Sequence, residues 1–176
     1  MAIDQTRTFT PINIAVLTVS DTRTPDNDTS GDILAARIVA AGHHLAARTI
    51  VTDDAALLAA QYDAWIDDPR IDAVVSTGGT GLTGRDVTPE ALSRIAGARD
   101  IPGFGELFRW LSFQTIGTST VQSRACAVVA RGTYIFALPG SNGAVKDGWD
   151  GILAEQLDSR NRPCNFVELM PRLKER

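Results

Sequence analysis

The sequence predicts an α/β protein with a mostly parallel sheet and one antiparallel strand. Three observations predict it: apolar runs alternate with helical patterns, glycine-rich turns follow two of the runs, and two late runs are separated only by Arg131-Gly132. Alternating strands and helices favour parallel strands with right-handed crossovers, and a two-residue link favours a hairpin. The 176 residues, 44% of them hydrophobic, suit one domain over 1–176, with 1–11 and 161–176 as extended terminal arms.

The first half of the chain alternates strands with helices. The apolar run at 12–19 is nearly continuous, which is typical of a strand covered on both faces. A polar loop follows, and Thr29 or Ser30 can cap the helix that then extends to Gly42. The remaining elements of this half are a strand at 44–51, a helix at 54–66 and a short buried strand at 72–76.

The second half adds a hairpin and three helices. Segment 102–113 places apolar side chains at helical spacing, which predicts a stripe that faces the core. The members of this stripe are Phe104, Leu107, Phe108 and Leu111. The predicted helices are 87–95, 102–113 and 144–157, and the hairpin strands are 125–130 and 133–138.

Composition narrows the choice of partners and compartment. Seventeen basic and twenty-one acidic residues give a net charge of −4, so we expect no nucleic-acid partner and no attraction to an anionic membrane. No apolar run is long enough to span a bilayer, and residues 1–11 lack the pattern of a secretion signal. Cys126 and Cys164 lack metal-ligand or disulfide spacing, which favours a cytoplasmic protein.

The most informative segment is 76–90, where an apolar strand passes through a glycine-rich turn, past Asp86, into a helix. Its four glycines let backbone N–H groups approach a phosphate without interference from Cβ atoms, and the helix N-terminus adds unpaired donors. The turn lacks the Gly-Lys-Ser/Thr of a Walker loop, and it is not the Gly-x-Gly-x-x-Gly of a dinucleotide site. These residues predict a local anion site, with Asp86 placed where a metal or a nucleophile is needed.

Polar groups follow four of the predicted strands. Ligands of open α/β sheets bind beyond the carboxyl ends of the strands, so these loops should converge. Any one loop is as well explained by helix caps and turn formers, but their coincidence favours a site. Two acidic loops facing glycine turns suit Mg²⁺ held by carboxylates and substrate phosphates, which would assist phosphoryl or nucleotidyl transfer. The loops carry Ser20 and Asp21, Thr52 and Asp53, residues 77–86, and Gly140, Ser141 and Asn142.

Several motifs, in the same order and over almost the whole chain, resemble the molybdenum cofactor biosynthesis family. These motifs are residues 77–90, 20–31 and 103–109, Ser123-Arg124, and Pro139-Gly140-Ser141. Stretches 111–119 and 162–166 look most like the B-type branch, whose relatives are the molybdopterin adenylyltransferases. The resemblance implies a molybdopterin-binding fold, which is a three-layer α/β/α sandwich, with molybdopterin as a ligand. It also implies a homo-oligomer built on a trimer and expected to be a hexamer.

The resemblance also implies a reaction and residue roles. In the adenylyltransferase branch, Mg-ATP activates the molybdopterin phosphate as an AMP ester, so ATP is a co-substrate and Mg²⁺ a cofactor. Asp53 and Asp86 match the two acidic positions of metal and transfer chemistry, although Asp54 could point inward in place of Asp53. Ser123 matches a serine on the pterin side, and the glycine loops match nucleotide contacts. With the polar loops above, the expected substrate-binding residues are Ser20, Asp21, Thr77, Gly78, Gly79, Thr80, Gly81, Ser123, Arg124, Pro139, Gly140, Ser141 and Asn142.

Some interpretations stay open at the level of sequence. Arg124 suits a phosphate contact and a salt bridge about equally well. The chain is either an adenylyltransferase, or a weak relative of one, or a non-catalytic molybdopterin-binding oligomer or carrier, because binding motifs do not establish turnover. A third class is a nucleotide-responsive α/β regulator, which would bind ATP and not molybdopterin.

Overall fold

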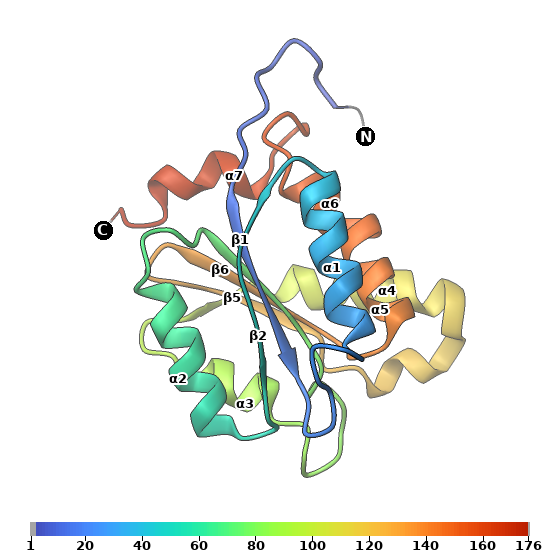
Figure 1. The fold of residues 1–176 in the computed structure, drawn as a ribbon. Helices are drawn as coiled ribbons and strands as arrows, with labels where there is room; N and C mark the ends of the chain where they lie inside the picture. Colours follow the sequence, from blue (N-terminus) through green and yellow to red (C-terminus); the bar gives the residue numbers. More distant parts are fainter. Residues whose placement is uncertain (1–2, 176) are drawn as a thin grey trace.

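The computed structural model describes residues 3–175 and is built on a six-stranded sheet (Figure 1). The strand order is β2-β1-β3-β6-β5-β4. The first three neighbouring pairs are parallel, whereas β5 is antiparallel to both of its neighbours, which confirms the predicted fold class. The strands are β1 Asn13–Val19, β2 His44–Val51, β3 Ala73–Thr77, β4 Arg99–Asp100, β5 Cys126–Ala130 and β6 Thr133–Leu138.

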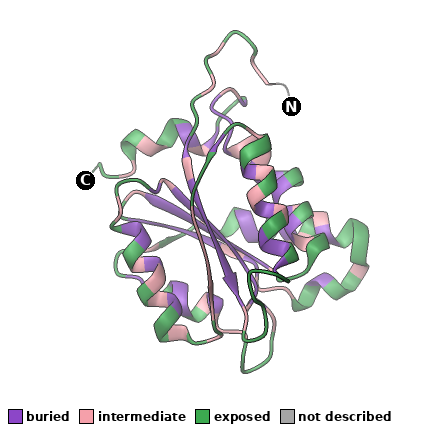
Figure 2. Cartoon of the chain, viewed as in Figure 1, coloured by how far each residue is buried: buried purple, intermediate pink, exposed green. Residues whose placement is uncertain are grey.

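Helices cover both faces of the sheet (Figure 1). The inner strands β1, β3, β6 and β5 are buried, whereas the edge strands β2 and β4 are intermediate or exposed (Figure 2). Because successive strand residues point to opposite faces, Val16 lies in the core with Leu34 of α1, and Leu17 lies in the core with Leu58 of α2. Helices α1, α4 and α5 cover the first face, and α2 and α3 the second. The helices are α1 Thr29–Ala40, α2 Ala55–Ile66, α3 Thr88–Ser93, α4 Pro102–Ile116, α5 Asn142–Gly148 and α6 Ala154–Gln156.

Some element boundaries differ from the prediction. Asp28, and not Thr29 or Ser30, caps α1, because its side chain accepts the N–H of Gly31. The predicted helix 144–157 begins two residues earlier, and a π-helical segment, η2 (Trp149–Leu153), separates α5 from α6. The two-residue strand β4 was not predicted, since it is short and polar. The hairpin is confirmed, and Arg131 and Gly132 at its turn both have positive φ angles.

The C-terminal segment is not the extended arm that its prolines predicted. It contains a short helix, α7 (Phe166–Leu169), and a 3₁₀ turn, η3 (Met170–Arg172). Asn165 caps α7, and Val167 is buried in the core. The N-terminal arm lies against the segment between α6 and α7, since the backbone N–H of Thr10 donates to Ser159 Oγ at 2.8 Å. Within residues 3–175, no helix is long and apolar enough to cross a membrane.

Candidate functional site

Four loops meet at the carboxyl end of the parallel strands, at the lower end of the sheet in Figure 1. They follow β2, β1, β3 and β6, which are neighbours in the sheet in that order. Backbone hydrogen bonds tie these loops to adjacent strands: Ser20 N–H donates to Val51 O, and Gly78 N–H donates to Leu138 O, each at 2.9 Å. The convergence that the sequence predicted is therefore present.

The turn after β3 needs glycine for close backbone packing. Gly78 has a φ of +109°, and a Cβ atom there would lie 2.2 Å from the Val19 carbonyl oxygen. Gly79 has a φ of +65°, and a Cβ there would lie 2.4 Å from Thr88 Oγ1. The backbone N–H groups of Gly79 and Thr80 donate to no acceptor within residues 3–175. These two donors are available to an anionic ligand.

Asp86 is held at the end of the glycine turn by its own loop. Its Oδ2 accepts the backbone N–H of Thr83 at 2.9 Å and the Thr83 hydroxyl at 2.7 Å. Burial raises the pKa of Asp86, but these bonds and one from the Gly81 N–H outweigh burial and lower it overall. Asp86 is thus kept ionised beside Gly81, where an added Cβ would lie 2.8 Å from its carboxylate.

Asp53 faces the same turn from the loop after β2. A Cβ added to Gly79 would lie 3.3 Å from Asp53 Oδ1. Burial, and next the negative charge of Asp86, raise the pKa of Asp53. Asp54 points elsewhere, because it caps α2 by accepting the N–H groups of Ala56 and Leu57. Of the two neighbouring acids, Asp53 is the one at the glycine turn.

Arg124, which precedes β5, forms hydrogen bonds to the glycine turn. Its Nε–H donates to the Gly81 carbonyl at 2.7 Å, its Nη2–H donates to the Asp86 carbonyl at 2.6 Å, and its Nη1 pairs with Glu90. The guanidinium therefore binds the loop itself, which supports the salt-bridge interpretation over a phosphate contact.

A second arginine joins the turn to the loop after β1. Arg85 pairs with Asp21, whose other oxygen accepts the Asp53 N–H at 3.2 Å. Ser20 accepts the N–H groups of Thr22 and Arg23 and shapes the same loop. Ser20 and Asp21 line a separate cavity of about 590 Å³ at the edge of β2. The structure thus places them as supports beside the turn.

A second cavity at this end of the sheet has a volume of about 390 Å³ and lies between the glycine loops and α4. Five of the predicted substrate-binding residues line it: Thr80, Gly81, Ser123, Pro139 and Ser141. The hydroxyl of Thr80, a residue only 2% exposed, has no hydrogen-bond partner among the described residues. A buried hydroxyl without a partner is costly, so this atom is a ready contact for a ligand.

The other predicted residues brace the cavity. The Thr77 hydroxyl donates to the Pro139 carbonyl at 3.1 Å, and Thr88 Oγ1 donates to the Gly78 carbonyl at 2.9 Å. Gly140 packs against Gly78, since a Cβ there would lie 3.3 Å from its Cα atom. The Thr77 and Gly140 contacts hold the two glycine loops together, and the Thr88 contact lies within the turn after β3.

The wall of the cavity opposite the glycine loops comes from α4, α5 and the 3₁₀ segment η1 (Gly117–Gln122). Polar residues at strand ends do not predict it. The sequence does contain one indication of this wall, because small polar residues recur at helical spacing along α4. The missed residues include Phe108, Ser112, Thr115, Ile116, Ser119 and Asp147.

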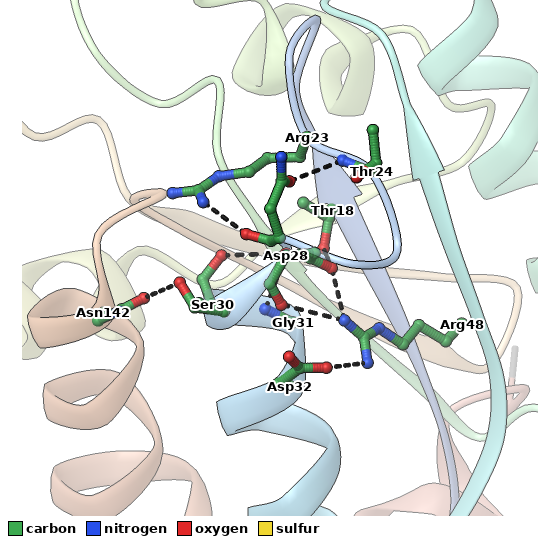
Figure 3. Close-up of polar contacts among 11 residues, drawn as sticks. Thr18, Arg23, Thr24, Asp28, Ser30, Gly31, Asp32, Arg48 and Asn142 are labelled. Atoms are coloured by element: carbon green, nitrogen blue, oxygen red, sulfur yellow. Dashed lines mark hydrogen bonds and ion pairs between the residues drawn. The ribbon is translucent and has the colours of Figure 1, made fainter.

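A buried carboxylate anchors the loop after β1 (Figure 3). Asp28 is fully buried and accepts hydrogen bonds from Thr18 Oγ1 at 2.7 Å, Gly31 N at 3.0 Å and Arg48 Nη2 at 2.8 Å. Burial raises the pKa of Asp28, but these bonds lower it overall. From the next residue, the Thr29 hydroxyl donates to Asn142 Oδ1 at 3.0 Å, which links this anchor to the loop after β6.

Asp53 and Asp86 fit a magnesium ion that is completed by phosphate oxygens. No group of three or more His, Cys, Asp or Glu side chains within residues 3–175 is placed to hold a metal. Mg²⁺ is commonly bound by one or two carboxylates together with substrate phosphates. Two carboxylates beside free N–H donors match that chemistry.

The fold and site define a class of α/β protein with glycine-rich loops, suited to an anionic ligand, at the carboxyl end of a parallel sheet. Comparisons with known proteins name the family. Residues 15–159 match the family model described as "Probable molybdopterin binding domain". The chain therefore belongs to the molybdopterin-binding domain family and, within it, to the molybdenum cofactor biosynthesis protein B group.

Individual relatives agree with this family. The chain is 51% identical to molybdenum cofactor biosynthesis protein B of Escherichia coli K12 over 158 residues, which are 90% of this chain and 92% of that protein. It is 42% identical to the protein of the same name from Bacillus subtilis strain 168, over 83% of this chain and 86% of that one. A crystal structure of molybdenum cofactor biosynthesis protein B superposes with a TM-score of 0.85 at 32% identity, covering 97% of this chain and all of that one. Membership assigns the chain to molybdenum cofactor biosynthesis.

Proposed function

We propose that the chain binds molybdopterin in the cavity between the glycine loops and α4 and joins AMP from ATP to the molybdopterin phosphate. One observation carries the proposal: Asp53 and Asp86 face the same glycine turn, which also supplies the buried, unpartnered hydroxyl of Thr80 to the cavity. Two carboxylates that can hold Mg²⁺, beside N–H and O–H groups that can bind phosphate, suit nucleotidyl transfer. Simple packing does not need such an arrangement.

The proposed roles follow from the geometry. The free N–H groups of Gly79 and Thr80 bind phosphate oxygens, and the Thr80 hydroxyl adds a third donor. Asp53 and Asp86 would hold Mg²⁺, which when bound neutralises phosphate charge. Arg124 and the Arg85–Asp21 pair keep the turn in place.

The reaction needs no protein nucleophile, because the acceptor is already a phosphate monoester. A molybdopterin phosphate oxygen attacks the α-phosphorus of ATP, and a new P–O bond forms there. The bond between the α-phosphorus and the oxygen that bridges it to the β-phosphorus breaks. Pyrophosphate leaves with the bonding electron pair, and the products are adenylylated molybdopterin and pyrophosphate. The residues contribute positioning and charge stabilisation.

The test is a transfer assay under anaerobic conditions with molybdopterin, ATP and magnesium. Wild-type protein should form adenylylated molybdopterin and pyrophosphate in equal amounts, and Asp86→Asn should form neither. Asp150→Asn is the matched control, because Asp150 lies on η2, outside the glycine loops, and pairs with Arg37. If wild-type protein binds molybdopterin tightly but gives no product, the chain is a non-catalytic binder or carrier. Affinity for ATP without affinity for molybdopterin would instead support a nucleotide-responsive regulator.

We also propose that the chain assembles into a homo-oligomer built on a trimer, with a hexamer as the expected form. An apolar surface on α4 and η1 supports assembly, because Trp110 is 62% exposed and Val121 is 79% exposed. Leu107, predicted to face the core, is exposed on this surface, whereas Phe104 and Phe108 are buried as predicted. Light scattering after gel filtration should report a trimer or hexamer for wild-type protein and smaller species for Trp110→Glu. A wild-type monomer at micromolar concentration would refute the assembly.

A further inference from the structure

Asp147 lies in the cavity between the glycine loops and α4, and no described residue forms an ion pair with it. It lies on α5 and lines the cavity opposite Thr115. Its one side-chain contact of hydrogen-bond length is with the Thr115 hydroxyl, 3.4 Å from Oδ2, and that hydroxyl lies closer, at 3.0 Å, to the Ser112 carbonyl oxygen. No ion pair within residues 3–175 includes Asp147. The carboxylate therefore has acceptor capacity left for a ligand.

The end of the cavity around Asp147 suits hydrogen-bond donors better than anions. No lysine, arginine or histidine lines it, and the nearby polar side chains are neutral hydroxyls such as those of Ser112 and Ser119. Phe108 and Ile116 add apolar surface. A ligand part that suits this end is flat, partly apolar, and carries N–H donors.

The two ends of the cavity differ in the groups that they present to a ligand. Asp147 is six residues along the chain from Ser141, and helical rise of about 1.5 Å per residue places it roughly 9 Å further along the helix axis. The glycine turn, with its free N–H donors, contributes Thr80 and Gly81 to the same cavity. One end of the cavity thus suits a phosphate, and the other suits a donor-bearing ring.

We infer that Asp147 recognises the aminopyrimidine edge of the bound pterin and so determines specificity for that ring. This inference rests on the proposed function. The 2-amino group and the N3–H of a pterin are adjacent donors, and a carboxylate can accept both in parallel, as it does from a guanidinium.

The inference is tested with two probes that differ at the recognised edge. One is a pterin monophosphate, and the other is the corresponding lumazine monophosphate, in which a carbonyl oxygen replaces the 2-amino group. Loss of a charge-assisted hydrogen bond should weaken binding of the lumazine by about tenfold or more in wild-type protein. Fluorescence titration of both probes measures the ratio without any need for turnover.

The variants separate this inference from the proposed function. Asp147→Asn should lower the preference for pterin to near one, whereas Asp150→Asn should keep it. Equal binding of both probes by wild-type protein overturns the role of Asp147 and leaves the molybdopterin site standing. Binding of neither probe overturns the site itself, and with it the inference. If Asp147→Asn fails to fold, as thermal melting would show, the wild-type ratio still decides.

Discussion

Arg124 Nη2 donates to the backbone oxygen of Asp86 at 2.6 Å, so a side chain preceding β5 fixes the residue that we propose to bind the metal. The same guanidinium reaches the Gly81 carbonyl at 2.7 Å. A flexible, glycine-rich turn would otherwise lose binding energy in becoming ordered around a ligand. Arg124 therefore preorganises the turn.

Replacement of Arg124 by lysine should loosen the turn while keeping the charge, because an ammonium lacks the planar fork that reaches two carbonyls. We expect amide hydrogen exchange in residues 80–88 to become about tenfold faster, the effect of losing roughly one or two hydrogen bonds. Arg70→Lys is the control, since the Arg70 side chain is 85% exposed and pairs with the nearby Asp68. Unchanged exchange in the Arg124 variant would mean that the turn orders itself.

Gly78→Ala should destabilise the protein. Alanine would have to adopt the φ of +109° and would place its Cβ 2.2 Å from the Val19 carbonyl. Positive φ alone costs about 1–2 kcal/mol, and the steric clash adds to it. Gly84→Ala should change the unfolding free energy little, because a Cβ there meets nothing within 4 Å. Chemical denaturation of the two variants measures the difference, and equal midpoints would contradict the packing described.

Asp53→Asn should stabilise the ligand-free protein and abolish magnesium-dependent ATP binding. Burial and the charge of Asp86 raise the pKa of Asp53, so its ionised form is disfavoured in the folded state at every pH above its unfolded value of about 3.9. The ionised carboxylate therefore destabilises the folded protein, and this cost disappears as the pH falls through the raised pKa and the group is protonated. Magnesium affinity should fall over the same pH range. Thermal melting and calorimetric titration with Mg-ATP measure the two effects. A lower melting temperature for Asp53→Asn would contradict this electrostatic account.

Asp28→Asn should destabilise the fold by about 2 kcal/mol, because it weakens a helix cap and leaves Arg48 short of a charged partner. Hydrogen bonds lower the pKa of Asp28 in the folded state despite its burial. The stability it provides is thus present above the unfolded pKa of about 3.9 and is lost as the pH falls through the lower folded pKa. Denaturation of wild-type and variant protein from pH 7 downward should show the difference shrinking.

Asp32→Asn is the control for this prediction, since Asp32 also contacts Arg48 but its side chain is 59% exposed. A surface pair of this kind contributes little, within about 1 kcal/mol. Equal losses from the two substitutions would show that the buried carboxylate has no special role.

The sequence predicted the part of the site that arises from strand ends. Asp53, Asp86 and the glycine loops follow apolar runs directly, and parallel strands must bring such loops to one edge of the sheet. The same pattern could not say which of Asp53 and Asp54 faces inward, because that depends on which one caps α2.

The rest of the site depends on packing that strand-end patterns do not encode. Asp147 and Thr115 reach the cavity only because α4 and α5 lie side by side on one face of the sheet. Asp28 replaced the predicted caps Thr29 and Ser30 because Arg48, distant in sequence, stabilises its buried charge. Arg124 was ambiguous until its partners were seen to be loop carbonyls.

The most direct measurement is a crystal structure of the protein with molybdopterin, prepared without oxygen. We predict the phosphate within hydrogen-bond distance, about 3 Å, of the N–H groups of Gly79 and Thr80, with the ring in the cavity beside α4. A phosphate bound away from the glycine turn, for example in the cavity beside Ser20 and Arg48 at the edge of β2, would contradict the account.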